Sequence, residues 1–432
     1  MGGKLLNPDF PFNPAKTPFY YGWVIWFLST LGFLMSIPGQ TMGMSVFTDP
    51  FLEAFDMTRT ELSLAYLFGT VGSSFFLTTA GRWFDRYGGR MMVTFSAFGL
   101  GLTVIFISLI DVLATSLKNN MLTIAMVFAG YLGVRFMGQG VLTSCSRNVL
   151  MPWFVRRRGL VSGIRGVCVS IGFSLAPFLL ALLIAEFGWR EALWILALLV
   201  GIFFPSLSYL FLRDKPEDIG LLADGGFPGT DDIPEEAPSK GLGEARRSPI
   251  FWLYTASLGI HALFGTALTF HIVSIFEEAG RSRDEAFFYF VPAAVFSTLV
   301  NLSASTIVDR YPLRPFQITM LIAFTLGAIG LLNLDAEWGF WLLAGGFGAG
   351  GGLWGVISSL AFIRFYGPLH LGEISGFNTS VTVFASAIGP AAFSLALDGF
   401  GYYGAAVKIC MVVLIVLIIL AFLLPQKEFG FD

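Results

Sequence analysis

Charged residues are scarce in this chain of 432 residues. Asp, Glu, Lys and Arg make up 13% of the sequence, whereas hydrophobic residues make up 55%. A soluble globular protein usually carries about a quarter charged residues, so this chain cannot cover a water-facing surface of its size. It also lacks a basic patch interleaved with aromatic residues, which excludes a nucleic acid as its partner. These absences indicate a membrane protein with lipid as one of its partners.

Motifs that bind metals or nucleotides are absent as well. The 3 cysteines, at Cys145, Cys168 and Cys410, lie in apolar stretches and show no metal-binding spacing. No phosphate-binding Walker sequence occurs. Residues 346–351 fit the dinucleotide pattern GxGxxG, but they lie inside an apolar run, where glycines instead allow close helix packing. We therefore expect no cofactor, no metal site and no catalytic residue, and hence no enzyme.

Long apolar runs dominate the sequence. Runs of about 20 apolar residues can cross a bilayer as helices, and they predict an all-α membrane protein with twelve membrane-spanning helices. The predicted spans are 21–46, 61–81, 91–112, 121–148, 160–185, 191–212, 250–275, 286–306, 316–334, 339–364, 374–397 and 403–424. Thr58 and Glu61 predict a capping box at the start of the second span.

A charged hairpin occurs once in each half of the chain. Residues 85–90 read DRYGGR and residues 309–314 read DRYPLR, each between the second and third spans of its half. The repeat predicts two related six-helix bundles in tandem, at 21–212 and 250–424. The stretch between them, 213–249, is rich in Pro, Gly and acidic residues, which is typical of a polar linker.

The distribution of Lys and Arg predicts the orientation. Most of the 26 Lys and Arg residues fall on the side that holds residues 1–20, the linker and the tail 425–432. Because cytoplasmic loops carry an excess of Lys and Arg, these segments are expected to be cytoplasmic. Residues 1–20 lack the apolar core of a cleavable signal, so we expect the first span to be retained. We expect an integral protein of a bacterial inner membrane.

The hairpin and two further segments resemble the major facilitator superfamily of transporters over nearly the whole chain. Residues 81–90 are similar to that superfamily's cytoplasmic signature between helices two and three, and residues 135–140 to its fourth-helix motif. Residues 153–163 are most similar to the monocarboxylate and oxalate–formate branch. The resemblance implies the major facilitator fold, in which two bundles surround a central cavity and give alternating access by rocking.

The resemblance also implies a cytoplasmic gate at the two hairpins. A carboxylate at a helix end, with guanidinium groups nearby, can form charge-assisted hydrogen bonds to a neighbouring bundle. The alternative is that these charges only set the topology. The gating residues that we predict are Gly81, Asp85, Arg86, Arg90, Asp309, Arg310 and Arg314.

Arg135 alone among Lys and Arg falls near the middle of a predicted span. Placing an arginine there costs about 2.5–3.5 kcal/mol, so its side chain should face protein or water and have a role. Tyr131, Arg135 and Gln139 follow one another at intervals of four residues and form one polar stripe. This stripe can bind an anionic substrate. Alternatively, Arg135 only bonds backbone carbonyls of a neighbouring helix.

Further polar residues complete the predicted site. Gln40, Asn378 and His271 are the other candidate substrate contacts. Since an imidazole titrates near neutral pH, His261 and His271 are candidates for a coupling proton, with Arg135 as the third. The alternative for either histidine is an ordinary place in the helix packing.

We expect a secondary transporter that moves a small, monocarboxylate-like organic anion by alternating access, as a monomer; coupling to a proton (symport) is left open. The first alternative is an exporter of neutral or amphipathic small molecules. The 46 Phe suit that alternative, as does a predicted eighth span without charge, where members of the branch commonly carry a cation. A non-transporting receptor is favoured least, because no signalling domain is recognisable.

Overall fold

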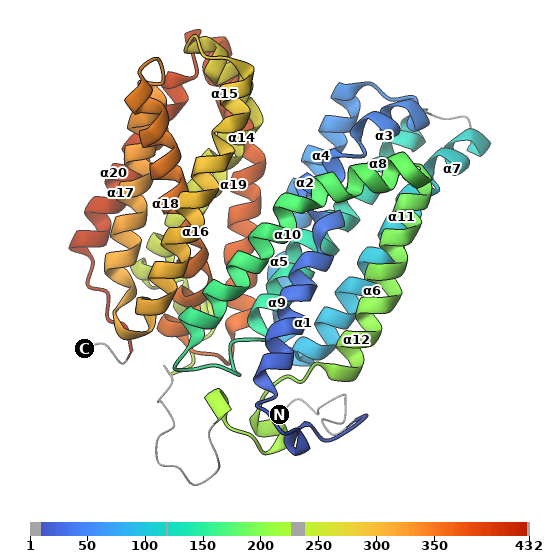
Figure 1. Ribbon diagram of the computed structural model, residues 1–432, viewed down its shortest axis with the longest axis vertical. Helices are drawn as coiled ribbons and strands as arrows, with labels where there is room; N and C mark the ends of the chain where they lie inside the picture. Colours follow the sequence, from blue (N-terminus) through green and yellow to red (C-terminus); the bar gives the residue numbers. More distant parts are fainter. Residues whose placement is uncertain (1–9, 118–119, 226–237, 430–432) are drawn as a thin grey trace. The chain divides into compact units, whose positions relative to one another are not determined.

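The computed structural model describes residues 10–117, 120–225 and 238–429 (Figure 1). Within these ranges the chain forms helices and no strand, which confirms the predicted all-α fold. The described residues contain 11 helices long and apolar enough to cross a membrane, and the bent pair α4–α5 makes 12 when it is counted as one span. The beginning of the predicted N-terminal segment (1–9), the middle of the linker (226–237) and the end of the tail (430–432) lie outside the described residues.

The chain divides into two compact units. The first falls within Met1–Arg156, Cys168–Pro234 and Leu369–Ser380, and the second within Arg157–Val167, Glu235–Pro368 and Val381–Asp432. Two long helices, α10 (Arg158–Phe187) and α19 (Leu371–Phe400), therefore each begin in one unit and continue in the other.

The helices of the first unit are η1 (Pro14–Lys16), α1 (Gly22–Met35), η2 (Ile37–Gly39), α2 (Thr41–Ser45), α3 (Thr48–Phe55), α4 (Arg59–Ser74), α5 (Leu77–Tyr87), α6 (Gly89–Ser108), α7 (Ile110–Leu117), α8 (Asn120–Val134), η3 (Arg135–Leu142), α9 (Thr143–Asn148), α11 (Trp189–Leu198), η4 (Leu199–Phe203), α12 (Phe204–Phe211), η5 (Glu217–Ile219) and η6 (Ala223–Gly225). Those of the second unit are α13 (Leu242–Ala245), α14 (Pro249–Glu278), α15 (Arg283–Phe288), α16 (Phe290–Ile307), η7 (Val308–Arg310), α17 (Leu313–Leu332), α18 (Glu337–Tyr366) and α20 (Gly404–Leu423).

The second predicted span begins as expected but is not one straight helix. Thr58 and Glu61 form the predicted capping box at the start of α4. The span then bends by 45° between α4 and α5. At the bend, the hydroxyls of Ser73 and Ser74 donate to the carbonyls of Thr70 and Val71 at 2.7 and 2.6 Å. Serine hydroxyls that bond back to their own helix compete with its backbone hydrogen bonds, which explains the break.

One end of the first unit gathers the segments predicted to share a side of the membrane. Arg213, after α12, and Arg90, at the start of α6, both donate to the carbonyl of Phe10, at 2.7 and 2.9 Å. Asp224 of the linker accepts a hydrogen bond from the backbone N–H of Val155 at 2.8 Å. The N-terminal segment, the first hairpin, the loop after the fourth span and the linker thus meet at one end.

The second unit shows the same arrangement. Arg364, at the end of α18, donates to Glu428 at 2.8 Å and pairs with Asp309 at 3.4 Å. The backbone N–H of Lys240, in the linker, donates to the carbonyl of Tyr366 at 2.9 Å. The linker, the second hairpin and the C-terminal tail therefore lie at the same end of this unit, as an even number of crossings between them requires.

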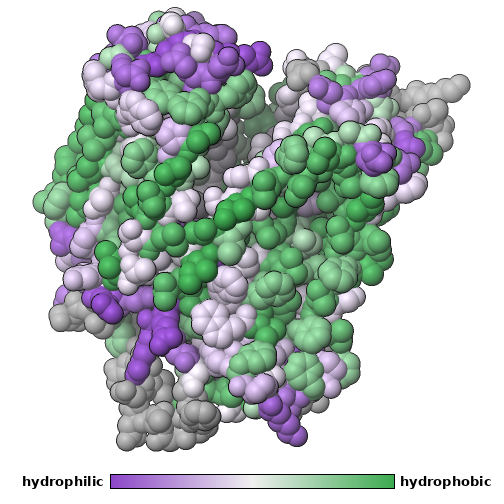
Figure 2. Space-filling view, viewed as in Figure 1, coloured by the Kyte–Doolittle hydropathy of each residue, from purple (hydrophilic) through white to green (hydrophobic). Residues whose placement is uncertain are grey.

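Apolar side chains cover the flanks of the helices, while hydrophilic residues gather at their ends (Figure 2). In the first unit, α1, α6 and α12 pack side by side (Figure 1). Their outward faces remain apolar, as the exposure of Trp23, Phe27 and Phe95 shows. A belt of this kind is stable only against lipid, which accounts for the low share of charged residues.

Candidate functional site

The fourth span changes its winding at Arg135. Residues Arg135–Leu142 form a π-helix, η3, between α8 and α9. The hydroxyl of Thr143 donates to the carbonyl of Gly138, five residues earlier, at 3.0 Å. Residues spaced by four drift slowly around an α-helix, because it has 3.6 residues per turn. A π-helix has more residues per turn, so within it such a row drifts in the opposite direction and the two drifts offset each other. Arg135, Gln139 and Thr143 therefore stay close to one side of the span.

The first span is broken where it faces this π-helix. Pro38 lacks an N–H and ends α1 in a short 3₁₀ turn, η2, before α2 begins. Gly39 in that turn lies so close to Gly138 that a Cβ built on Gly138 would be 2.8 Å from the Gly39 Cα. Two glycines thus allow the backbones to touch and leave the carbonyl of Gly39 free for a partner.

Arg135 supplies that partner. Its Nη1 donates to the carbonyl of Gly39 at 3.1 Å and to the hydroxyl of Thr41 at 3.3 Å. Its Cζ lies 5.1 Å from the centre of the Tyr66 ring, and Tyr66 in turn meets Tyr131 edge to face at 5.2 Å. A guanidinium over a desolvated aromatic ring gains about 2 kcal/mol. We call Arg135, Tyr66, Tyr131, Gly39 and Thr41 the Arg135 site.

The charge of Arg135 is not neutralised. The side chain is 2% exposed, and its Nε has no hydrogen-bond partner. No described carboxylate forms an ion pair with Arg135. The carbonyl of Gly39 is the kind of partner that a purely structural arginine would use, but it satisfies only part of the guanidinium. A buried cation held only by dipoles and a ring is suited to bind an anion.

Gln139 and Gln40 lie next to this site. The Oε1 of Gln139 is buried and has no hydrogen-bond partner. The Nε2 of Gln40 donates to the hydroxyl of Ser36 at 3.0 Å and lies 3.4 Å from that of Thr143. The structure thus brings four of the predicted residues together in the first unit, Tyr131, Arg135, Gln139 and Gln40. Asn378 also belongs to this unit, on the first turns of α19.

His271 lies in the second unit, in a hydrogen-bonded cluster. Its Nε2 is 2.9 Å from the carbonyl of Pro390 and 3.4 Å from the hydroxyl of Ser394, and its Nδ1 is 3.3 Å from the hydroxyl of Tyr403. A carbonyl can only accept, so Nε2 carries a proton and Nδ1 is the acceptor in the neutral ring. Glu278 accepts a hydrogen bond from the backbone N–H of Tyr403 at 3.2 Å.

His261 has different surroundings. Its ring stacks on Phe324 at 4.5 Å between centres and lies 5.3 Å from the Trp354 ring. Its Nδ1 is buried and has no hydrogen-bond partner. These contacts are those of a ring packed among aromatic side chains.

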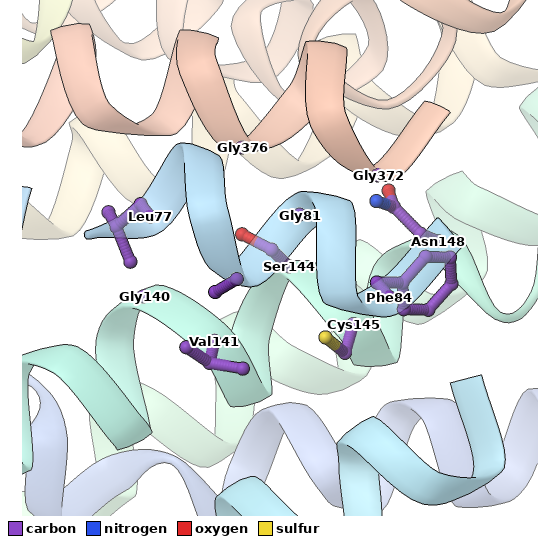
Figure 3. Close-up of a pocket in the computed structure, with 11 residues that line it drawn as sticks. Leu77, Gly81, Phe84, Gly140, Val141, Ser144, Cys145, Asn148, Gly372 and Gly376 are labelled. Atoms are coloured by element: carbon purple, nitrogen blue, oxygen red, sulfur yellow. The ribbon is translucent and has the colours of Figure 1, made fainter. Parts of the chain in front are cut away.

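The first hairpin caps the beginning of α19. Asp85 accepts hydrogen bonds from the backbone N–H groups of Gly372 and Glu373 at 2.7 and 2.8 Å. A carboxylate at a helix N-terminus satisfies free N–H groups and complements the helix dipole. Gly81 lies one turn earlier on α5, and a Cβ there would collide with the carbonyl of Gly372. In Figure 3 the helix that carries Gly372 and Gly376 runs directly over Gly81.

The second hairpin repeats this contact. Asp309 accepts hydrogen bonds from the backbone N–H groups of Gly159 and Leu160, at the start of α10, at 2.8 and 3.3 Å. It also pairs with Arg364 at 3.4 Å. Each hairpin carboxylate thus caps the helix that begins in its own unit and continues in the other.

The predicted arginines of the hairpins lie elsewhere. The guanidinium of Arg86 lies over the ring of the neighbouring Tyr87, and Arg310 is exposed. The buried Arg90 donates to the carbonyls of Tyr209 and Phe10. Arg314 donates to the carbonyls of Ala421 and Phe422. Arg90 and Arg314 therefore anchor their own helices to chain segments far away in the sequence.

Other polar groups at α19 were missed by sequence reasoning. Arg82 donates to Glu373 at 2.7 Å, and the amide of Asn148 donates to the hydroxyl of Ser375 at 2.7 Å. Nothing in their local sequence marks them, because each partner lies more than 200 positions away. Between α5, α9 and α19 a cavity of about 10 Å³ remains, lined by Ser144, Cys145 and Asn148 among others (Figure 3). It has room for about one water molecule, so it is not a substrate site.

Comparisons with known proteins agree with this architecture. A model of the Major Facilitator Superfamily matches residues 27–361. The proton:xylose symporter XylE has a TM-score of 0.70 at 14% identity, covering 94% of this chain and 96% of its own. A bacterial homologue of the iron transporter ferroportin, in an outward-facing state, has a TM-score of 0.71 at 16% identity, covering 92% and 98%.

A curated relative matches part of the sequence. The probable L-galactonate transporter of Escherichia coli (strain K12) is 27% identical over 175 residues. The match covers 40% of this chain and 34% of the relative, about a third of that protein's length.

We predict that Gly138→Ala disturbs the Arg135 site. The added methyl group has no room against Gly39, and overpacking of this kind destabilises a protein by about 1–3 kcal/mol. The thermal unfolding midpoint of the purified variant should fall below that of the wild type. Gly241→Ala is the matched control, because a Cβ at Gly241 meets nothing within 4 Å. Equal midpoints for the two variants would contradict the close approach of the first and fourth spans.

Proposed function

The chain belongs to the Major Facilitator Superfamily, and we propose that it carries a small organic anion of the monocarboxylate type across the membrane together with a proton. The family and its transporter relatives make it a multi-pass membrane transporter and not an enzyme. We further propose that it works as a monomer in a bacterial inner membrane, with both termini cytoplasmic. The excess of Lys and Arg on one side of the predicted spans supports this orientation.

The observation that carries the proposal is the unpaired charge of Arg135. This residue lies near the centre of the candidate span Met121–Asn148, where an arginine costs about 2.5–3.5 kcal/mol. A carboxylate bound against its free Nε would recover part of that cost through charge-assisted hydrogen bonds. The partial relative adds support, since galactonate, which its name gives as substrate, is a carboxylate.

Replacing Arg135 tests the anion site. In Arg135→Gln we expect the affinity for pyruvate or gluconate to fall about 30-fold or more, because losing one partner of a buried charge pair costs about 2–5 kcal/mol. Arg135→Lys should bind with intermediate affinity, since it keeps the charge but not the planar guanidinium group that can donate two parallel hydrogen bonds to a carboxylate. Counterflow of labelled anion in proteoliposomes measures this.

The control for this test is Arg157→Gln, which removes a charge from an exposed arginine. It should exchange anions like the wild type. If Arg135→Gln transports with unchanged anion dependence, Arg135 is not part of the substrate site.

We assign the coupling proton to His271 and not to His261. The ring of His271 has a partner at each nitrogen, so either protonation state keeps its hydrogen bonds: the Tyr403 hydroxyl donates to the neutral ring and accepts from the charged one. His261, stacked among aromatic rings, has no acceptor for a second N–H.

The proton assignment predicts a separation of two activities. His271→Gln should lose the stimulation of uptake by an inward proton gradient but keep counterflow, which needs no net proton movement. His261→Gln should respond to the gradient like the wild type. Uptake of labelled anion with and without a pH difference across the vesicle membrane measures both. A normal gradient response in His271→Gln would refute the assignment.

We propose that the capping contacts of Asp85 and Asp309 form the cytoplasmic gate. They hold the first turns of α19 and α10, whose later turns belong to the other unit. A helix cap contributes only about 0.5–2 kcal/mol, so such a contact can open and close during each transport cycle.

Removing the carboxylate of Asp85 should release α19. In Asp85→Ala, a cysteine placed at the buried Ser375, with the three native cysteines replaced, should react about 2- to 30-fold faster with a polar maleimide from the cytoplasmic side. The range corresponds to the free energy of the lost cap. Asp335→Ala, which removes an exposed acid, serves as control. An unchanged labelling rate would count against the gate and against its cytoplasmic position.

A further inference from the structure

Arg147, at the end of the fourth span, makes no side-chain contact among the described residues that would give it a structural role. Its side chain is half-buried on α9, and among the described residues it forms no hydrogen bond, ion pair or ring contact. Other arginines at this end of the first unit have partners: Arg213 donates to the carbonyls of Leu210, Leu212 and Phe10, and Arg82 donates to Glu373. A half-buried cation without a partner is a candidate binding group.

The neighbours of Arg147 show which way it faces. Ser144 and Asn148 point to α19, where the Ser144 hydroxyl lies 3.4 Å from that of Thr379. Cys145 lines the cavity on the side of α5. Successive residues of an α-helix are about 100° apart, so Arg147 lies roughly 160° from Cys145. It therefore faces away from α5, on the far side of the contact between α9 and α19.

Asn378 lies on that same side of α19. Gly376 and Ser380 of this helix face α5: a Cβ at Gly376 would touch the carbonyl of Leu77, and the Ser380 hydroxyl lies 3.4 Å from that of Thr78. Asn378 is about 200° around the helix from Gly376 and so points away from α5. It is 4% exposed, and its Oδ1 has no hydrogen-bond partner.

Arg147 and Asn378 repeat the pairing found at the Arg135 site. There an arginine with unused donor capacity lies one turn from a buried amide oxygen without a partner, that of Gln139, whereas Arg147 and Asn378 lie on two helices in contact, α9 and α19. An unpaired buried acceptor costs about 1–3 kcal/mol, which a ligand hydroxyl can recover by donating to it. A carboxylate beside each arginine and a hydroxyl beside each amide oxygen would satisfy both groups at once.

We propose that Arg147 and Asn378 form a second station for the transported anion, and that this anion is a hydroxylated acid. The inference rests on the proposed function, because it extends the substrate path of the Arg135 site. The two arginines are 12 positions apart on one span, or about 18 Å along its axis. The Arg135 site is the first station and binds the anion at the middle of the membrane. The second station, at Arg147 and Asn378, receives the anion at the cytoplasmic end of the span.

Exchange kinetics in proteoliposomes test the second station. Arg147→Gln should keep the thermal stabilisation by gluconate that the Arg135 site provides, but should slow gluconate counterflow at least tenfold. Arg147→Lys should restore part of the rate. Arg247→Gln, at an exposed arginine, is the matched control. Counterflow at the wild-type rate in Arg147→Gln overturns the second station.

Asn378→Leu tests the hydroxyl preference. It should lower gluconate exchange several-fold more than exchange of pyruvate, which has no hydroxyl group. An equal effect on the two anions overturns the assignment of a hydroxylated acid. These outcomes are distinct from failure of the proposed function, in which the wild type exchanges neither anion and Arg135→Gln changes nothing. If Arg135→Gln abolishes exchange while the Arg147 and Asn378 variants do not, only the second station is refuted.

Discussion

An uncompensated guanidinium in the middle of a membrane-spanning helix is the constraint on which the site depends. Arg135 has no described carboxylate partner, so the surrounding backbone is arranged to hold its charge. The break of the first span at Pro38 frees the carbonyl of Gly39, and the glycines of the π-helix let that carbonyl approach. Tyr66 adds the face of its ring. These contacts hold the arginine in the protein, but they leave its Nε without an acceptor, which the proposed anion would supply.

Transport requires that binding at such a site be linked to a structure that can move. The two hairpin carboxylates provide contacts of suitable strength, because each caps only two N–H groups at the start of a helix. The capped helices, α19 and α10, each contribute to both units, so the loss of a cap is transmitted along a continuous helix. Asn378 lies on the capped part of α19, so an anion bound there would act on the gate that we propose.

The spans, the repeat and the charged residue in the middle of a span could be predicted from the sequence. Hydropathy located the spans, the repeated hairpin singled out Asp85, and Arg135 stood out because a charge in the middle of a span needs a reason. Features that depend on distant partners could not be predicted. Arg90 was expected at the gate, but its carbonyl partners come from Phe10 and Tyr209. The bend between α4 and α5 and the π-helix at Arg135 were not predicted either.

We propose that the protein recognises the transported molecule by its negative charge. The most direct measurement is the thermal unfolding midpoint of the purified wild-type protein with gluconate and with glucose, which have closely related carbon skeletons but differ in the carboxylate. Because a ligand that binds only the folded state raises its stability, we expect a midpoint that rises with gluconate concentration and does not change with glucose. An equal rise with both compounds would contradict it, because Arg135 would then not be what selects the substrate.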